Sequence, residues 1–203
     1  MRSAWERWES FWVGGMRRGA VFRRFDAGLL ITRVAFDDGA GSTFLCESLL
    51  RLTATGETWS GFRYRQEPGG LRSGARRDDL GHGPDTLPTS GEYLLVARLA
   101  RSGTARATFR RVDEAEPAAP AAPAEVHRRG AETIDVPEGR SLRAERWEVV
   151  AGGVRVGVWW SQDGGLVRGA SAGALTFACR EEAALGGLAA PLGGFLHDGF
   201  GPD

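Results

Sequence analysis

The sequence predicts an all-β protein, in which a strongly curved antiparallel meander forms a half-barrel or an open barrel. Short segments rich in glycine and aspartate recur at regular intervals, and apolar and polar residues alternate between them, as in strands joined by tight turns. Glycine supplies 30 of the 203 residues, about twice its average share of about 7%. No segment alternates strands with helices in the way that a parallel sheet requires, which disfavours an α/β fold.

The first element is expected to be a short amphipathic helix over residues 4–13. Ser3 and the glutamate three residues later have the spacing of a capping box, and Trp5, Trp8 and Trp12 recur at helical spacing. We expect this tryptophan stripe to cover an open end or face of the sheet. The alternative is that the stripe contacts a partner protein.

The rest of the first half is predicted to consist of strands and turns. Residues 42–54 show the alternation most clearly, because Phe44, Cys46 and Leu50 share one parity and mostly polar residues share the other. A polar segment over residues 67–90 is expected to be a long loop. The strands expected in this half are 20–26, 29–37, 42–54, 57–66, 91–100 and 104–112.

The second half continues the same meander within a single β domain of residues 1–180. Residues 113–125 are rich in proline and alanine, and we expect an extended connector inside this domain rather than a boundary between two domains. Residues 181–203 are rich in glycine and alanine and are expected to form a flexible tail, with one short helix over 181–186 as an option. The strands expected in this half are 126–136, 141–151, 154–162, 165–171 and 174–180.

Two cysteines, Cys46 and Cys179, are too few for a disulfide scaffold or a zinc knuckle. Both fall at apolar positions of expected strands, where a free thiol behaves as a small hydrophobic group. We therefore expect two buried thiols. The alternative is that they meet across the core as a redox-sensitive pair.

No targeting or membrane-spanning segment is expected. Glu6, Arg7 and Glu9 interrupt the apolar residues near the N-terminus, whereas a secretory signal needs about 7–15 uninterrupted apolar residues. No window approaches the run of about 18 apolar residues that a membrane span needs. A cytoplasmic location is therefore the expectation.

The charge balance argues against a general polyanion binder. The 26 basic residues, all of them arginine, are matched by 26 acidic residues, whereas a nucleic-acid binder carries a basic surplus. Nucleic acid is therefore not an expected partner. The lack of lysine and asparagine is typical of a GC-rich genome, so an arginine is not by itself interpreted as functional.

No motif predicts catalysis, so a non-catalytic protein is favoured, with an enzyme that places His82 inside the cavity as a further alternative. The glycine doublets lie between strands rather than before a helix, which indicates turns rather than a nucleotide-binding loop. His82 lies in a loop with several aspartates, a group that can hold a metal or move a proton. We expect this loop instead to be solvated and salt-bridged. No metal or other cofactor is expected.

The strongest functional signal is a set of tryptophans and arginines on the less apolar face of three expected strands. Such a mixture predicts that both faces of the sheet are covered, or that one face lines a cavity whose glycines leave room for a ligand. Tryptophans would form the walls, and an arginine would meet an anionic headgroup. The candidate ligand-binding residues are Trp59, Arg63, Trp147, Arg155 and Trp159.

Three stretches of the second half carry a family resemblance. They are Glu132-Thr-Ile-Asp-Val-Pro-Glu-Gly139, Arg146-Trp-Glu-Val-Val150 and Trp159-Trp-Ser-Gln-Asp-Gly-Gly-Leu-Val-Arg168. Through them, residues 126–180 resemble the C-terminal meander of uncharacterised bacterial half-barrel proteins, which are similar in layout to lipoprotein carriers. The resemblance implies a strongly curved antiparallel sheet with a groove for an apolar ligand.

We therefore expect a protein that binds a hydrophobic or amphipathic small molecule in the groove of a curved sheet. The alternative is a non-catalytic interaction or structural protein that uses the tryptophan-rich helix or an edge strand as its contact. The sequence favours no particular oligomeric state.

Overall fold

A computed structural model describes residues 4–201 and places the thirteen strands of this part of the chain in one sheet. Their order across the sheet is β6-β5-β4-β3-β2-β1-β13-β12-β11-β10-β9-β8-β7. Two meanders are joined by the pairing of β1 with β13, and β7 pairs with β8 in parallel. The strands are β1 (Trp5–Val13), β2 (Met16–Asp26), β3 (Leu29–Asp37), β4 (Thr43–Leu52), β5 (Trp59–Glu67), β6 (Leu71–Arg76), β7 (Thr86–Pro88), β8 (Arg106–Val112), β9 (Ala122–Val136), β10 (Arg140–Ala151), β11 (Val154–Gln162), β12 (Gly165–Ser171) and β13 (Ala174–Cys179).

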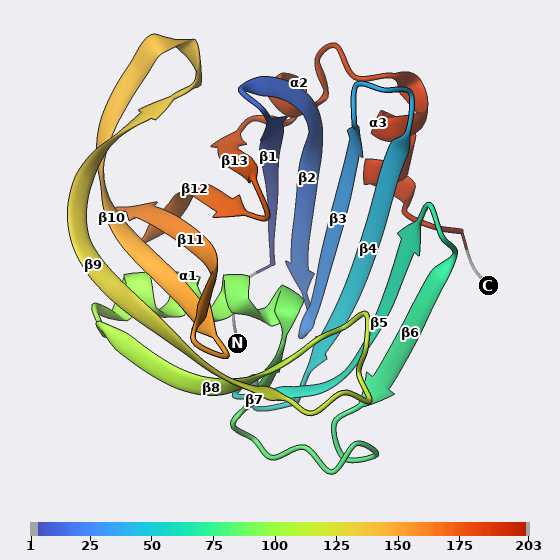
Figure 1. The fold of residues 1–203 in the computed structure, drawn as a ribbon, viewed down its shortest axis with the longest axis vertical. Helices are drawn as coiled ribbons and strands as arrows, with labels where there is room; N and C mark the ends of the chain where they lie inside the picture. Colours follow the sequence, from blue (N-terminus) through green and yellow to red (C-terminus); the bar gives the residue numbers. More distant parts are fainter. Residues whose placement is uncertain (1–3, 202–203) are drawn as a thin grey trace.

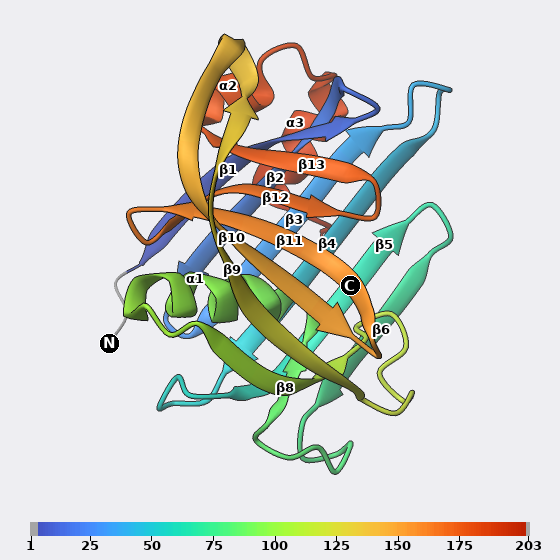
Figure 2. The ribbon, with the colours of Figure 1, turned by 60° about the vertical axis from the view of Figure 1, so that its left-hand side comes forward.

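The sheet is open and strongly curved, and one helix lies inside the curve (Figure 1, Figure 2). The predicted mostly-β, barrel-like architecture is therefore confirmed. The described residues hold three α-helices, none of them at the N-terminus, so the prediction of one N-terminal helix is wrong. The helical segments are α1 (Glu92–Ser102), α2 (Glu181–Leu185), α3 (Ala190–Asp198) and the 3-10 turns η1 (Thr89–Gly91) and η2 (Pro137–Gly139).

Two glycine doublets form two-residue hairpins, as the sequence predicts. Gly14 and Gly15 join β1 to β2 with φ angles of 58° and 78°, and Gly152 and Gly153 join β10 to β11 with φ angles of 56° and 81°. A two-residue hairpin of this kind needs positive φ at both central residues, a conformation that glycine adopts without steric cost.

The main core lies between α1 and the concave face of the sheet. Five apolar side chains follow one another across neighbouring strands in register. These are Trp5, Phe25, Leu30, Leu50 and Phe62. Side chains of α1 pack between this row and strands β8 to β11 on the opposite wall. The helix therefore holds the two halves of the curved sheet together by apolar burial.

A second core covers the convex face. Trp8 and Phe22 are register partners on β1 and β2, with ring centroids 4.7 Å apart. Leu192, Phe195 and Leu196 of α3 pack against this pair from outside the sheet. Both faces of the sheet are thus covered in this region, which is why apolar residues occupy both parities of β1 and β2.

Residues 5–13 form strand β1, so the prediction of a helix over 4–13 is wrong. Trp5 packs in the concave core, whereas Trp8, of opposite parity, packs in the convex core. Because both faces are covered, large apolar residues follow no simple alternation, and their spacing imitates a helical stripe. Ser3, the expected cap, lies outside the described residues. β1 therefore presents no exposed tryptophan helix to a partner.

Residues 91–100, predicted as a strand, form most of α1. Glu92 to Ala97 and Leu99 are all buried, so the segment lacks the continuous polar face that marks a surface helix. Its leucines, alanines and arginines are strong helix formers, and Gly103 ends the helix in the left-handed conformation at φ 72°. Residue propensity therefore favours a helix in this segment.

Two further segments differ from expectation. The polar segment 67–90 contains strands β6 and β7 in addition to loops. The tail contains α2, close to the optional helix, and α3, which packs on the convex face and so is not a loose end. The proline- and alanine-rich segment leads from β8 to β9, which pair antiparallel within the one sheet.

Cys46 and Cys179 are free, half-buried thiols on opposite faces of the sheet. Cys46 shares the concave parity of Leu50, whereas Cys179 is the register partner of Trp8 on the convex side. They therefore do not meet across the core. Burial raises the pKa of the Cys46 thiol to about 11 and also raises the pKa of Cys179, so both stay protonated near neutral pH.

Candidate functional site

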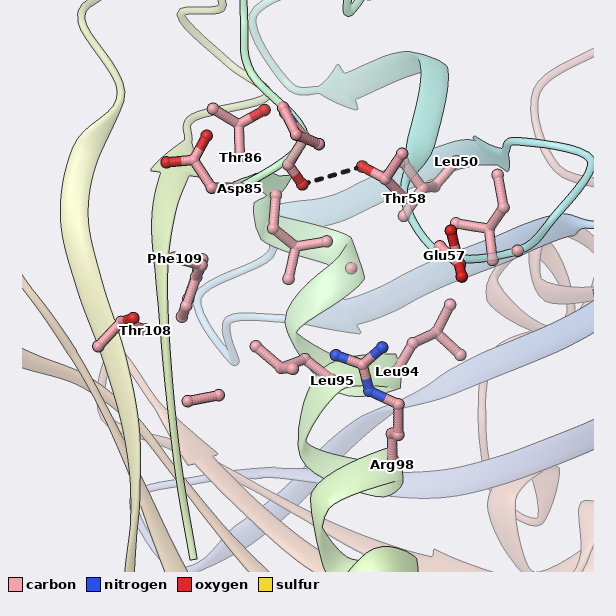
Figure 3. A pocket seen from close by; sticks show the side chains of 16 residues that line it. Leu50, Glu57, Thr58, Asp85, Thr86, Leu94, Leu95, Arg98, Thr108 and Phe109 are labelled. Atoms are coloured by element: carbon pink, nitrogen blue, oxygen red, sulfur yellow. Dashed lines mark hydrogen bonds between the residues drawn. The ribbon is translucent and has the colours of Figure 1, made fainter. Parts of the chain in front are cut away.

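A pocket opens at one end of the concave interior, between α1 and the walls of the sheet (Figure 3). Its volume is about 160 Å³. One side is formed by α1, and the others are formed by the end of β4, by β8 and by the segments 56–58 and 84–87. The curvature of the sheet brings these distant parts of the chain to one place.

The floor of the pocket is apolar. Leu94 and Leu95 of α1 line it together with Leu50 of β4 and Phe109 of β8. Gly91 allows the helix to begin close to this wall, because a Cβ at that position would lie 2.6 Å from Cδ1 of Leu87, which also lines the pocket. The floor is thus a rigid part of the main core rather than a surface loop.

The rim carries one cation and two carboxylates. Arg98 of α1 is exposed and turns its guanidinium toward the pocket (Figure 3), and it has no ion-pair or hydrogen-bond partner within residues 4–201. Glu57 and Asp85 lie on the same rim. Thr58 Oγ1 donates a hydrogen bond to the Pro84 carbonyl at 3.3 Å, which joins the two loops at the mouth. The rim therefore offers a guanidinium that has no ion-pair or hydrogen-bond partner among the described residues, beside an apolar floor.

A buried ion cluster lies on the concave face beside α1. Arg7 Nε and Arg23 Nη1 lie 2.8 and 2.6 Å from Glu9 Oε1, and Arg23 lies 4.5 Å from the centroid of the Tyr93 ring. Burial opposes ionisation of Glu9, but Arg23 and Arg7 outweigh it and lower the pKa of the carboxyl to about 2. Arg23 also lies 5.7 Å from the Trp159 ring. The cluster therefore ties β1 and β2 to α1 and to the opposite wall.

The structure places the three candidate tryptophans together in the concave core. Trp59 and Trp147 are fully buried. Their indole N–H groups donate to the Thr86 carbonyl at 3.0 Å and to Ser161 Oγ at 2.9 Å. Trp159, the register partner of Trp147, is half-buried and meets the Tyr93 ring of α1. In this structure they pack against protein rather than line an open groove.

The two candidate arginines lie elsewhere. Arg63 is exposed and faces the convex side, as does its register partner Leu49. An irregularity in the pairing of β4 with β5 places Trp59 on the opposite, concave face. Arg155 is exposed, and its Nη1 lies 3.5 Å from Glu148 Oε1. The structure therefore does not bring Arg63 or Arg155 to the tryptophans. Arg98 was missed because its segment was predicted as a strand.

His82, the other candidate, is half-buried in the loop before β7. Its ring centroid lies 6.3 Å from that of Trp59, and its backbone N–H donates to the Arg77 carbonyl at 3.1 Å. Within the described part of the chain, no group of three or more histidine, cysteine or acidic side chains is arranged to hold a metal ion. In that same part, no helix has the length and apolarity to cross a membrane.

The chain matches no family model and no curated protein. A crystal structure from Brucella abortus, described as a beta-barrel-like protein of domain of unknown function DUF1849, is similar to it with a TM-score of 0.51 and 10% sequence identity. The match covers 86% of this chain and 95% of that one. The resemblance to uncharacterised bacterial half-barrel proteins is therefore confirmed at the level of the fold.

Proposed function

We propose that the protein binds a small amphipathic molecule in the pocket beside α1, with its apolar body on the leucine-rich floor and its anionic group at Arg98. One observation carries this proposal. An unpaired guanidinium stands above an apolar floor, an arrangement that suits a ligand with an apolar part and one negative charge.

The size and charge of the pocket narrow the class of ligand. A volume of about 160 Å³ is close to the cavity of about 150 Å³ that accepts benzene in another protein. Glu57 and Asp85 on the same rim repel additional negative charge. A monoanion, or a zwitterion whose amine meets one of these carboxylates, is therefore favoured over a dianion.

Isothermal titration calorimetry with hexanoate and its neutral analogue 1-hexanol tests this proposal. Arg98→Gln should weaken hexanoate binding about tenfold or more and leave hexanol unchanged, because a hydrogen bond to a charged group contributes about 1.5–3 kcal/mol. Arg101→Gln, at another exposed arginine of α1 that does not line the pocket, is the matched control.

A second variant separates the pocket from its charge. Ala107→Phe should fill the pocket from β8 and abolish the binding of both probes. Saturable binding of neither probe to the unmodified protein would overturn the proposal. So would hexanoate binding that Arg98→Gln leaves unchanged.

A further inference from the structure

A second hollow lies on the convex side of the sheet, between the arch formed by β9 and β10 (Figure 1) and the outer faces of β1, β12 and β13. Its volume is about 590 Å³. It is separate from the pocket beside α1, because Trp160 faces away from the core that contains its neighbour Trp159. Its aromatic and apolar lining includes Trp12, Ile134, Trp160, Leu175 and Phe177.

Arg168 of β12 supplies the cation of this hollow. Its guanidinium carbon lies 4.4 Å from the centroid of the Trp160 ring and 5.4 Å from that of Phe177. Its Nε is shielded from solvent and has no hydrogen-bond acceptor. No ion pair or hydrogen bond of Arg168 occurs within residues 4–201. The guanidinium is thus held against two rings, and its in-plane N–H groups can donate to an acceptor on a ligand.

The acidic residues around the hollow already have donors. Trp160 Nε1 donates to Glu132 Oε1 at 2.6 Å, and Ser141 Oγ donates to Asp135 Oδ1 at 2.7 Å. Burial lowers the pKa of Arg168, and these two carboxylates oppose that shift. The guanidinium stays charged, and neither carboxylate forms a direct ion pair with it.

Regular pairing of β1 with β13 sets the position of the aromatic wall. Ser10 pairs with Phe177 and Trp12 pairs with Leu175, so these side chains share the convex face. The Trp12 indole meets the Phe177 ring edge-on, with centroids 6.1 Å apart, and Trp12 Nε1 donates to Ser10 Oγ at 2.9 Å. The ring is therefore fixed beside Arg168 rather than free to turn.

We propose that this hollow binds a planar aromatic monocarboxylate, whose carboxylate accepts hydrogen bonds from Arg168 and whose ring lies against Trp12 and Phe177. The planar fork of a guanidinium matches the geometry of a carboxylate, and aromatic rings favour edge-on and offset contacts. Glu132 and Asp135 disfavour a second negative charge, which argues against a phosphate dianion.

Fluorine NMR titration with 4-fluorobenzoate, and with 4-fluorobenzamide as the neutral analogue, tests the proposal. We expect a saturable shift for the carboxylate and at least tenfold weaker binding of the amide. Arg168→Gln should weaken carboxylate binding at least tenfold, and Arg168→Lys should restore only part of it, because lysine keeps the charge but not the fork. Arg143→Gln, at an exposed arginine of the same arch, should change nothing.

Two more variants keep the test decisive. Val136→Trp should fill the hollow from the arch and abolish binding while Arg168 remains. Arg98→Gln, in the other pocket, should leave the titration unchanged. The absence of a saturable shift, equal binding of the amide, or an equal loss in Arg143→Gln and Arg168→Gln would each overturn the proposal.

Discussion

The Glu9 carboxylate lies 2.6 Å from the guanidinium of Arg23, and both side chains are more than nine-tenths buried. Replacing the acid by an amide leaves buried Arg23 and half-buried Arg7 without this counter-charge. We expect Glu9→Gln to lower the free energy of unfolding by about 3–5 kcal/mol, the usual loss when one member of a buried pair is removed. Urea denaturation at pH 7 measures this loss.

The neighbouring surface pair is the control for this substitution. Glu6 lies on the same strand, is half-exposed and is 3.8 Å from Arg24. Exposed pairs contribute little, so Glu6→Gln should change the free energy of unfolding by about 0.5 kcal/mol or less. Equal losses in the two variants would contradict the view that burial makes the Glu9 pair important.

The Glu9 pair should also make stability depend on pH. The pKa of Glu9 falls from 4.5 to about 2 in the folded protein. Because the folded-state pKa is the lower one, the stabilisation is complete above about pH 5 and is lost as the pH falls toward 2, by about 1.4 kcal/mol per pH unit. The stability gap between the unmodified protein and Glu9→Gln should therefore narrow from pH 6 to pH 3. A constant gap would refute this linkage.

Glu114, in the segment between β8 and β9, connects strand β4 to the η1 turn that follows the edge strand β7. It is 2% exposed, and its carboxylate accepts hydrogen bonds from Ser48 Oγ at 2.6 Å, Thr89 Oγ1 at 2.6 Å, and Ser90 N and Oγ at 2.8 and 2.9 Å. Glu114→Gln turns one acceptor into a donor facing donors, so we expect a loss of about 2–3 kcal/mol. Chemical denaturation measures it, with the exposed Glu116→Gln as the neutral control. A loss no larger than that of Glu116→Gln would contradict this role of the Glu114 carboxylate.

The parts of the fold that the sequence predicted are those whose signal is local. Hairpin turns need particular φ angles, so the Gly152-Gly153 doublet predicts a turn wherever the rest of the sheet lies. The two errors that exchange helix and strand, at 4–13 and 91–100, share one cause. Both segments are covered on two sides, so neither shows the single apolar face on which a periodicity argument depends.

The sequence predicted a site made of tryptophans and arginines, whereas the pocket beside α1 is lined by Arg98, leucines and Phe109. The face of Trp59 depends on an irregular register between β4 and β5, which alternation along one strand does not reveal. Arg98 has helical spacing from Leu94 and Leu95, so a helical interpretation of that segment would have placed all three on one surface. The pairing of Arg168 with aromatic rings depends on contacts between strands.

Gly19 makes the β2–β3 pairing possible at the aromatic end of the concave face. A Cβ there would lie 2.0 Å from the Ala35 carbonyl oxygen, and Phe11 and Phe36 stack beside it with centroids 4.7 Å apart. Because backbone would have to move, we expect Gly19→Ala to cost at least about 3 kcal/mol in unfolding free energy. An added Cβ at Gly194 of α3 would have no atom within 4 Å. Gly194→Ala should therefore raise the unfolding free energy by about 0.5–1 kcal/mol. Thermal and urea unfolding of both variants measure this contrast, and a mild effect at Gly19 would show that the strands can separate there at little cost.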